Sequence, residues 1–357
     1  MLPASTLSEA VRNVASGTTR AVILFAIWSA LLICAVLSDQ LAIRMILDGS
    51  NAFRSSGASV SVMIANGRVE GSVCDSLNQL PNVRAAGALR LADNDLVAAT
   101  MPSSPIPTFE VSSGLVAILT SRAGSGVFVS RDLANGLGTS AGDPFYLTGG
   151  EKTEVAGVFD YPTDGRRPGL AYSVLETVAP TGYFDECWVD IWPRSDEVLS
   201  LMGTTVGPAS QADEPPPQLT QLNSTLGVSF PAVELFRDRP TANLPLYLVA
   251  GGGLLGFFAV WTRKLELASA RHLGVTSGAQ MAQMTIEASV WLCASSLVAF
   301  AVACVLGTFV SASDLMSLLV PSLIMIGAGA VANIAATILT VSWIDGTHYL
   351  IYFRDRQ

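Results

Sequence analysis

The chain has 357 residues, of which 50% are hydrophobic and only 14% are charged, against roughly 25% charged in a typical soluble domain. This composition excludes a disordered chain, a fibrous protein and an ordinary cytosolic enzyme, and it favours a membrane protein. The formal net charge of −9 argues against nucleic acid as a partner, because nucleic-acid binding depends on neutralising phosphates. Neither of the two lysines, Lys152 and Lys264, follows a glycine as the lysine of a P-loop does. Any ATP hydrolysis must therefore come from another chain.

The N-terminal region holds a short patterned segment and then the first long apolar run. In segment 1–20, Leu7, Val11 and Val14 have the spacing of one apolar helical stripe. This spacing predicts a cytoplasmic amphipathic helix, with a disordered tail as the alternative. The apolar run that follows predicts a first transmembrane helix over 21–47. Because no small-x-small cleavage motif follows this run, a transmembrane helix is favoured over a signal peptide.

Between the first and second spans lies a long segment, 48–242, that contains no apolar run able to cross a bilayer. Its alternating apolar residues and turn signals predict an α+β domain. We expect strands at 60–65, 83–91, 126–130, 144–148, 153–159 and 187–192, helices at 69–80, 131–137 and 195–202, and a loop at 207–218.

Three more apolar stretches reach the length of about 20 residues that a span needs. They predict transmembrane helices at 243–262, 285–310 and 315–344, the last with Pro321 as a point where it could kink. A loop, 263–284, joins the first two of these helices, and a tail, 345–357, follows the last. The fold class is thus an integral membrane protein with four transmembrane α-helices in a 1+3 arrangement. An α+β extracytoplasmic domain is inserted between helices 1 and 2.

The distribution of charge predicts the orientation in a cell membrane. Residues 39–242 carry 13 basic and 23 acidic side chains, whereas basic side chains cluster before the first span and in the 263–284 loop. Since Lys and Arg collect on the cytoplasmic side, we expect both termini and this loop in the cytoplasm and 48–242 outside. Trp261, Trp291 and Trp343 all fall near the predicted cytoplasmic ends of spans, as an interfacial aromatic belt would place them.

Several motifs resemble those of the MacB/FtsX family of ABC transporter permeases. In segment 127–160 a strand and short helix are followed by Leu137-Gly138, Gly142-Asp143 and the sequence VAGVF, in the order of that family's extracytoplasmic domain. Upstream, SLNQLPNVRAAG (76–87) is similar to the family's helix-to-strand step. In the cytoplasmic loop and the start of the next span, the family's pattern is matched by Glu266, Arg271, Leu273, Gly274 and Glu287.

The resemblance also has departures. Leu265, Ala268 and Val275 stand where the family has Arg, Gly and Ala, and the tail lacks the usual basic ending. The subfamily is therefore left open. The resemblance implies a dimer with a second permease chain, identical or homologous, above two ABC ATPase subunits that bind ATP and Mg²⁺. This chain itself would bind no cofactor. Closure of the ATPases would be transmitted outward as motion of the external domain, which is called mechanotransmission.

The 263–284 loop is the strongest candidate site. A short helix ending at Gly274 would present its polar residues to a cytoplasmic partner. The expected ATPase-coupling residues are Lys264, Glu266, Arg271, His272, Leu273 and Gly274. The alternative is an interfacial helix that only anchors to lipid headgroups.

Cysteine, histidine and glycine positions give the remaining predictions. Cys74 and Cys187 are the only cysteines outside the predicted spans, and an even pair in an oxidising compartment suggests a disulfide. Segment 48–242 has no histidine, which excludes Ser-His-Asp chemistry and leaves zinc without its usual ligands there. We therefore expect no catalytic residue and no metal site. Gly252 and Gly256 form a small-xxx-small step that favours helix packing, either within the chain or at a dimer seam.

The predicted function is that of a permease subunit coupling a separate ATPase to export or extraction of a peptide, a lipid-linked molecule or a hydrophobic compound. One alternative is an FtsX-like regulator that transmits force to an extracellular cell-wall hydrolase. Another is a membrane-anchored receptor or adhesin without an ATPase. An extracellular accessory protein would be a further partner of the first two.

Overall fold

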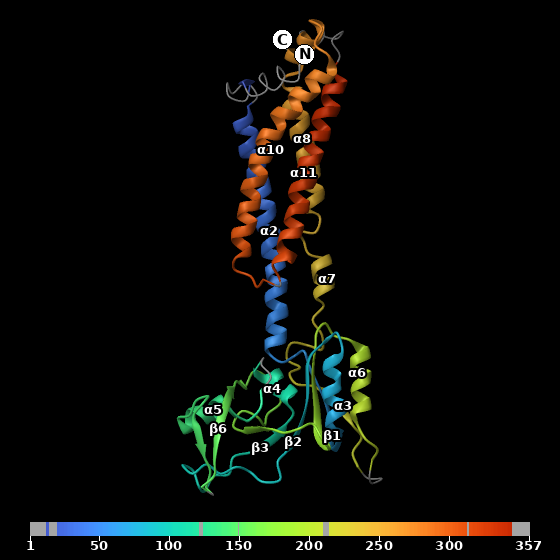
Figure 1. Ribbon diagram of the computed structural model, residues 1–357. Coiled ribbons are helices and arrows are strands. Elements are labelled where there is room, and N and C mark those ends of the chain that lie inside the picture. Colours follow the sequence, from blue (N-terminus) through green and yellow to red (C-terminus); the bar gives the residue numbers. More distant parts are fainter. Residues whose placement is uncertain are drawn as a thin grey trace. The chain divides into compact units, whose positions relative to one another are not determined.

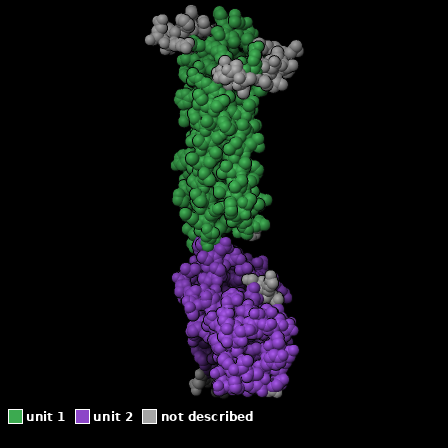
Figure 2. Space-filling view, turned by 90° about the vertical axis from the view of Figure 1, so that its left-hand side faces the viewer, with its two compact units in different colours: residues 1–48, 231–357 green, residues 49–230 purple. Residues whose placement is uncertain are grey.

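The computed structural model describes residues 12–13, 20–120, 124–148, 150–209, 214–312 and 314–344. Most of the predicted N-terminal amphipathic helix, and the whole 345–357 tail, lie outside the described residues. The chain divides into two compact units, coloured separately in Figure 2. Unit 1 comprises residues 1–48 and 231–357, and unit 2 comprises residues 49–230.

Unit 1 is built from long apolar helices (Figure 1). In the described part of the chain, four helices are long and apolar enough to cross a membrane: α2 (Ala21–Ser55), α8 (Leu244–Trp261), α10 (Ser277–Gly307) and α11 (Leu315–Trp343). Two short helices, α7 (Ala232–Arg237) and α9 (Lys264–His272), precede and follow α8. Trp28 and Leu32 of α2 are fully buried in one cluster with Trp291 of α10 and Met325 of α11. The four long helices therefore pack around a common apolar core.

The glycines of α8 allow it to approach α11 closely. A Cβ atom added to Gly252 would lie 2.3 Å from the carbonyl oxygen of Gly329, and one added to Gly256 would lie 2.4 Å from that of Asn333. Both distances are shorter than side chains permit. The structure thus places this small-xxx-small step at a helix contact within the chain.

Two long helices extend beyond the predicted bounds. Helix α2 continues to Ser55, past the expected end at 47, and α10 begins at Ser277, inside the segment expected to be a loop. The side chain of Thr276 caps α10 by accepting a hydrogen bond from the Ala279 amide, which explains the start of this helix. Helix α11 runs through Pro321 without ending.

Unit 2 contains a mixed sheet, nine-stranded in the residues that the structure describes. Its strand order is β5-β6-β4-β7-β3-β2-β8-β1-β9. The pairs β3–β7 and β4–β6 are parallel, and the other neighbours are antiparallel. The strands are β1 (Val60–Glu70), β2 (Val83–Leu91), β3 (Thr108–Val111), β4 (Val127–Ser130), β5 (Pro144–Tyr146), β6 (Lys152–Phe159), β7 (Val174–Thr177), β8 (Tyr183–Ile191) and β9 (Gln218–Gln221).

Short helices pack on this sheet. They are α3 (Gly71–Ser76), α4 (Ser113–Thr120), α5 (Arg131–Leu137) and α6 (Asp196–Met202), with 3₁₀ turns at Leu77–Gln79 and Gly203–Thr205. Cys74 of α3 and Met202 of α6 are fully buried in one cluster with Val69 and Phe184 of the sheet. Strand β2 and helix α5 have the predicted bounds, and the strand pair β5–β6 is confirmed.

The predicted helix at 69–80 is wrong for its first two residues. Val69 and Glu70 instead extend β1, where they pair with Phe184 and Tyr183 of β8. Helix α3 begins only at Gly71, whose added Cβ would lie 2.5 Å from the ring of Phe184. The close ring at this point explains why a glycine stands where the strand ends.

Candidate functional site

Helix α9 is a short connection between α8 and α10, and its ends are set by its sequence. Gly274 has φ +93°, a left-handed conformation that ends a helix and is easily adopted by glycine. The Val275 amide donates back to the Ala270 carbonyl, which satisfies one of the last free carbonyls of α9. The predicted short helix ending at Gly274 is therefore present.

The buried side of α9 is attached to the ends of three long helices. Leu267 and Ala268 of α9 are 3% and 0% exposed. They form one apolar cluster with Val260 of α8, Met284 of α10, and Val341 and Ile344 at the end of α11. Burial of this apolar area stabilises the contact, so α9 cannot move without disturbing the helices beneath it.

Arg271 adds polar connections to the same neighbours. Its guanidinium donates to the Gln280 side-chain oxygen of α10 at 2.9 and 3.1 Å, to the Val341 carbonyl at 3.1 Å and to the Ile344 carbonyl. The Gln280 amide in turn donates to the Leu267 carbonyl at 2.7 Å, and Gln280 is 1% exposed. Arg271, which the sequence analysis expected to face a partner, thus ties α9 to α10 and α11.

Glu266 contacts Arg263, at the start of α9. Arg263 donates two hydrogen bonds to the Glu266 carboxylate, at 2.6 and 2.8 Å, and also pairs with Glu287 of α10. Glu287 is 3% exposed and also accepts from the Asn13 and Gln283 side chains. This network fixes the junction of α8, α9 and α10.

The exposed face of the candidate site lies at the end of α9. Leu273 is 85% exposed, and His272 and Gly274 are also exposed. The Lys264 ammonium lies 4.7 Å from the centroid of the Trp261 ring. Leu273 is a candidate contact for a partner, because removing an exposed apolar side chain from water is favourable.

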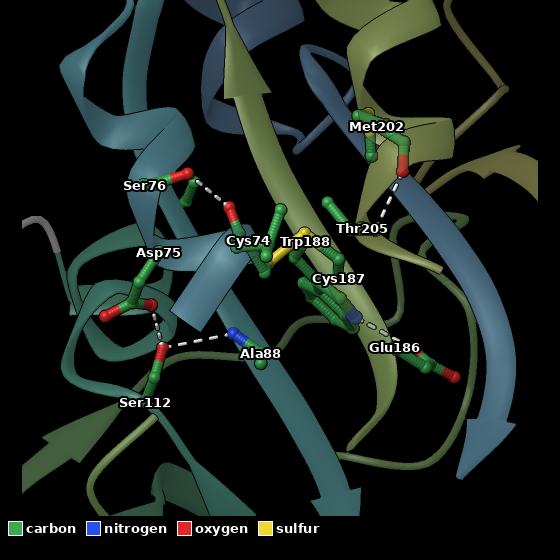
Figure 3. The surroundings of a disulfide bond; sticks show 12 residues. Cys74, Asp75, Ser76, Ala88, Ser112, Glu186, Cys187, Trp188, Met202 and Thr205 are labelled. Atoms are coloured by element: carbon green, nitrogen blue, oxygen red, sulfur yellow. Dashed lines mark hydrogen bonds between the residues drawn. A yellow bond between two sulfur atoms is a disulfide. The ribbon is translucent and has the colours of Figure 1, made fainter. Parts of the chain in front are cut away.

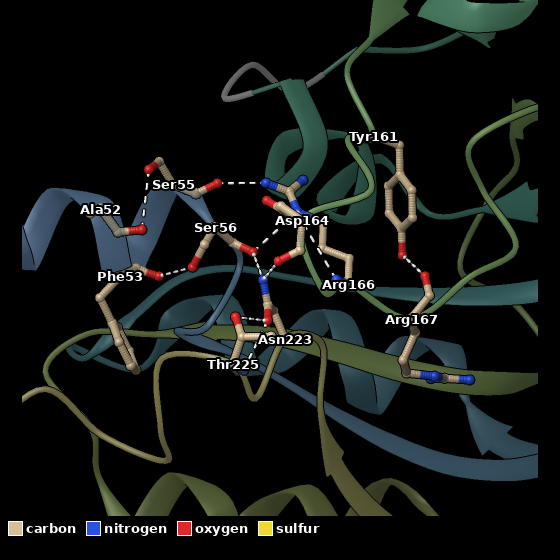
Figure 4. Close-up of polar contacts among 10 residues, drawn as sticks. All are labelled: Ala52, Phe53, Ser55, Ser56, Tyr161, Asp164, Arg166, Arg167, Asn223 and Thr225. Atoms are coloured by element: carbon tan, nitrogen blue, oxygen red, sulfur yellow. Dashed lines mark hydrogen bonds and ion pairs between the residues drawn. The ribbon is translucent and has the colours of Figure 1, made fainter.

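A second polar site holds the far end of α2, within unit 2. Arg166 donates to the Ser56 carbonyl at 3.1 Å and to the Ser55 carbonyl at 2.5 Å (Figure 4). The Asn223 amide donates to the Ser56 carbonyl at 3.0 Å and to the Asp164 carbonyl at 3.2 Å. Carbonyls at a helix C-terminus lack intrahelical partners. Two segments far apart in sequence therefore cap this helix and hold its last turn.

Aromatic side chains secure the same turn. Phe53 of α2 is 3% exposed, and its ring centroid lies 6.1 Å from those of Trp192 and Phe230. Such centroid distances are typical of stabilising aromatic pairs. The end of α2 is therefore packed as well as hydrogen-bonded into unit 2.

The structure joins Cys74 and Cys187 in a disulfide (Figure 3). The bond links α3 to β8 across 113 positions of sequence, and both cysteines are fully buried. Beside it, the Ser112 hydroxyl donates to the Asp75 carboxylate at 2.6 Å and accepts from the Ala88 amide at 3.0 Å. Burial raises the pKa of Asp75, and this hydrogen bond partly opposes the rise.

In the described ranges, no three His, Cys, Asp or Glu residues are grouped as metal ligands would be. The remaining cysteines, Cys34, Cys293 and Cys304, carry free thiols and lie in α2 and α10.

Sequence reasoning missed Arg166, Asn223 and Gln280, whose side chains make polar contacts in these sites. All three act on backbone carbonyls of segments more than ten residues away. Contacts of this kind depend on the tertiary fold and leave no local pattern. Only the Arg166-Arg167 pair in a Gly- and Pro-rich loop offered a signal.

Comparisons with known proteins give only low-scoring structural similarities. No family model matches the chain, and no curated protein sequence matches it. Among solved structures, one similar chain is the periplasmic region of MacB from Actinobacillus actinomycetemcomitans, with 8% identity and a TM-score of 0.33, covering 47% of this chain and 91% of that one. Another is the extracellular domain of the noncanonic ABC-type transporter YknZ from Gram-positive bacteria, with 14% identity and a TM-score of 0.27, covering 40% and 88%. At these scores neither similarity bears on function.

Proposed function

We propose that this chain is the permease subunit of an ABC transporter and that it passes the motion of separate ATPase subunits to its extracytoplasmic domain. The proposal is supported by the motifs in the 127–160 and 263–287 segments and by the four long apolar helices. ATP and Mg²⁺ would be held by the partner ATPase, and this chain would catalyse no reaction of its own.

The attachment of α9 is the observation that carries the proposal. A connection that transmits force must contact the ATPase and must also be stiff against the spans. Leu267, Ala268 and Arg271 fasten α9 to α8, α10 and α11, while Leu273 is left exposed for a partner. A lipid anchor would need the apolar contact but would not need the buried Arg271–Gln280 network.

The other end of the transmission path would be α2. This helix is continuous from Ala21 to Ser55, and unit 2 holds its last turn through Arg166, Asn223 and Phe53. A displacement of α2 along its axis would therefore be passed directly to the sheet. We assign the N-terminus and α9 to the cytoplasm and unit 2 to the outside, on the charge distribution alone.

The assembly we propose has two permease chains, identical or homologous, and two ATPase subunits. Its cargo would be a peptide, a lipid-linked molecule or a hydrophobic compound exported or extracted from the outer leaflet. Such cargo needs no wide aqueous path, which four spans per chain would not readily provide.

The test is copurification of the full chain from mild detergent, with identification of bound proteins by mass spectrometry. We expect an ABC ATPase whose hydrolysis is stimulated by the chain. Leu273→Asp should lower its recovery about tenfold, because a charge would be buried at the contact position. The matched control is Leu226→Asp, which alters a leucine that is 51% exposed in unit 2. Recovery of no ATPase, or equal recovery with Leu273→Asp, would contradict the proposal.

A further inference from the structure

A cavity in unit 2 lies beside the end of α2 and shares Ser55 and Arg166 with the polar contacts described above. Its volume is about 550 Å³, within the range of small-molecule sites. Its walls combine Ile118 and Leu119 of α4 with Leu222 and Pro162. Its charged lining consists of Arg54, Arg84, Arg166, Asp160 and Asp190.

The two carboxylates of the cavity are already neutralised. Asp160 pairs with Arg131 through both oxygens, and the pKa of Asp160 is lowered by this hydrogen bonding. Asp190 accepts from the Ser59 hydroxyl at 2.6 Å and from Arg84 at 3.1 Å. The residues 49–230 carry 10 basic and 19 acidic side chains. Arg166 likewise pairs with Asp164 at 3.3 Å, so among the described residues Arg54 is the one arginine of this lining without a carboxylate partner. The cavity therefore keeps one uncompensated positive charge in an acidic unit.

Arg54 is the group that most requires a ligand. Its Nε is buried and has no hydrogen-bond acceptor among the described residues. Its guanidinium carbon lies 5.8 Å from the Trp192 ring centroid, a distance at the limit of a cation–π contact. An unsatisfied buried donor is costly, and the cost is greater for a charged group. The Nε itself is closed to solvent, so an acceptor in the cavity would meet the other nitrogens of the Arg54 guanidinium, for which the structure records no hydrogen bond.

Capping of the α2 dipole does not account for Arg54. A cation near a helix C-terminus is favourable, and Arg54 stands in the last turn of α2. However, the terminal carbonyls of Ser55 and Ser56 are taken by Arg166. The structure records no hydrogen bond from Arg54 to these carbonyls.

We propose that this cavity binds a phosphate group. Guanidinium groups present paired N–H donors that match phosphate oxygens, and Arg54 and Arg84 both line the cavity. Arg84 bonds to Asp190 through one nitrogen, Nη1, which leaves its other donors to a ligand. The apolar wall from α4 suits the non-phosphate part of the ligand. Such a group could come from a soluble phosphate ester or from a phospholipid headgroup, and this proposal does not depend on the proposed permease function.

The test uses the full chain in an uncharged detergent and measures binding by isothermal titration calorimetry. One arm titrates inorganic phosphate. The other titrates dioctanoyl-phosphatidylglycerol, with dioctanoylglycerol as the ligand that lacks phosphate. We expect Arg54→Gln to weaken binding of the phosphate-bearing probe by about ten- to hundredfold. Arg194→Gln is the matched control, since Arg194 lies outside the cavity and pairs with exposed Asp196.

Each outcome either supports or overturns the phosphate site. Binding of inorganic phosphate, with or without the lipid, would support a general phosphate site, and binding of the lipid alone would support a headgroup site. Ala117→Trp, which fills the cavity but keeps all three arginines, should abolish binding in either case and covers the event that Arg54→Gln does not fold. Absence of binding by both probes, equal binding of dioctanoylglycerol, or unchanged affinity in Arg54→Gln or Ala117→Trp would overturn the proposal.

Discussion

At the scale of single residues, the Cys74–Cys187 disulfide joins two distant parts of the unit 2 sequence. Each is the central buried residue of its own element, α3 or β8, and their Cα atoms lie 5.8 Å apart. A bond across 113 positions restricts the unfolded chain strongly. The pair was predictable because only two cysteines stand outside the spans, although nothing in the sequence located them on adjacent elements.

We expect the double variant Cys74→Ala/Cys187→Ala to lose about 2–5 kcal/mol of unit 2 stability. Thermal proteolysis of the full chain would measure this, with Cys34→Ala in α2 as the control. Non-reducing peptide mapping of the unaltered protein should recover one linked peptide pair. Two free thiols in freshly purified protein, alkylated before unfolding, would be the contrary result.

Asp75, next to that disulfide, gives a pH-dependent prediction. Its pKa is raised in the folded state from the usual 3.8, chiefly because half-burial removes water from the carboxylate. At a pH between 3.8 and the raised pKa, Asp75 therefore keeps its proton in the folded state and has lost it in the unfolded state. The associated stability is fully present below pH 3.8 and is lost as the pH rises through the raised value.

Asp75→Asn should consequently stabilise unit 2 at pH 7, since the amide oxygen can still accept from Ser112 and carries no charge to desolvate. The advantage should shrink toward pH 4. Melting temperatures of both proteins across this range provide the measurement. A difference that does not vary with pH would show that ionisation of Asp75 has no part in it.

At the scale of elements, long helices were easier to predict from the sequence than short strands. The long helices are predictable from apolar run length alone, and β2 and α5 from alternation and capping. The strands β3, β7 and β9 were not predicted, because they are short and are defined by their partners in the sheet, whereas β4, which is equally short, was marked by its apolar sequence. The extension of β1 through Glu70 depends on pairing with β8, which no local pattern reveals.

The candidate site, like the fold, was predictable only where local sequence signals define it. The position of α9 and its end at Gly274 follow from local signals. The role of Arg271 does not, because its acceptors, Gln280, Val341 and Ile344, come from two other helices. A charged residue in a predicted loop is expected to be exposed, whereas the fold directs the Arg271 side chain toward α10 and α11.

Arg166→Ala tests the clamp on α2 (Figure 4). It removes the hydrogen bonds to the Ser55 and Ser56 carbonyls, which we expect to cost about 1–3 kcal/mol locally. The amides of Ser56, Gly57 and Ala58, which donate to carbonyls of the last turn, should exchange with solvent faster.

Arg167→Ala is the matched control for that change. Arg167 pairs with Glu186 at 2.9 Å and makes no contact with α2 that the structure records. Its replacement should leave exchange at residues 56–58 as in the unaltered protein. Identical exchange in both variants would mean that Arg166 does not hold the helix end.

At the scale of the whole molecule, the proposed function requires α9 to lie in the cytoplasm and unit 2 to lie outside the cell. In a chain whose free cysteines, Cys34, Cys293 and Cys304, are replaced by alanine, a cysteine at Pro215 should react with an impermeant thiol reagent in intact cells. A cysteine at Ser277 should react only after permeabilisation. Both positions are exposed, so access is decided by the membrane. The reverse pattern would refute the orientation.

Under the proposed function, unit 2 responds to nucleotide bound by a partner on the other side of the membrane. Hydrogen exchange of the purified permease–ATPase complex, with and without a non-hydrolysable ATP analogue, measures this most directly. We predict that the analogue changes exchange at residues 49–58, where α2 enters the sheet unit, and that Leu273→Asp removes the change. Exchange throughout residues 49–230 that is unaffected by the analogue, in a complex that hydrolyses ATP, would contradict the claim.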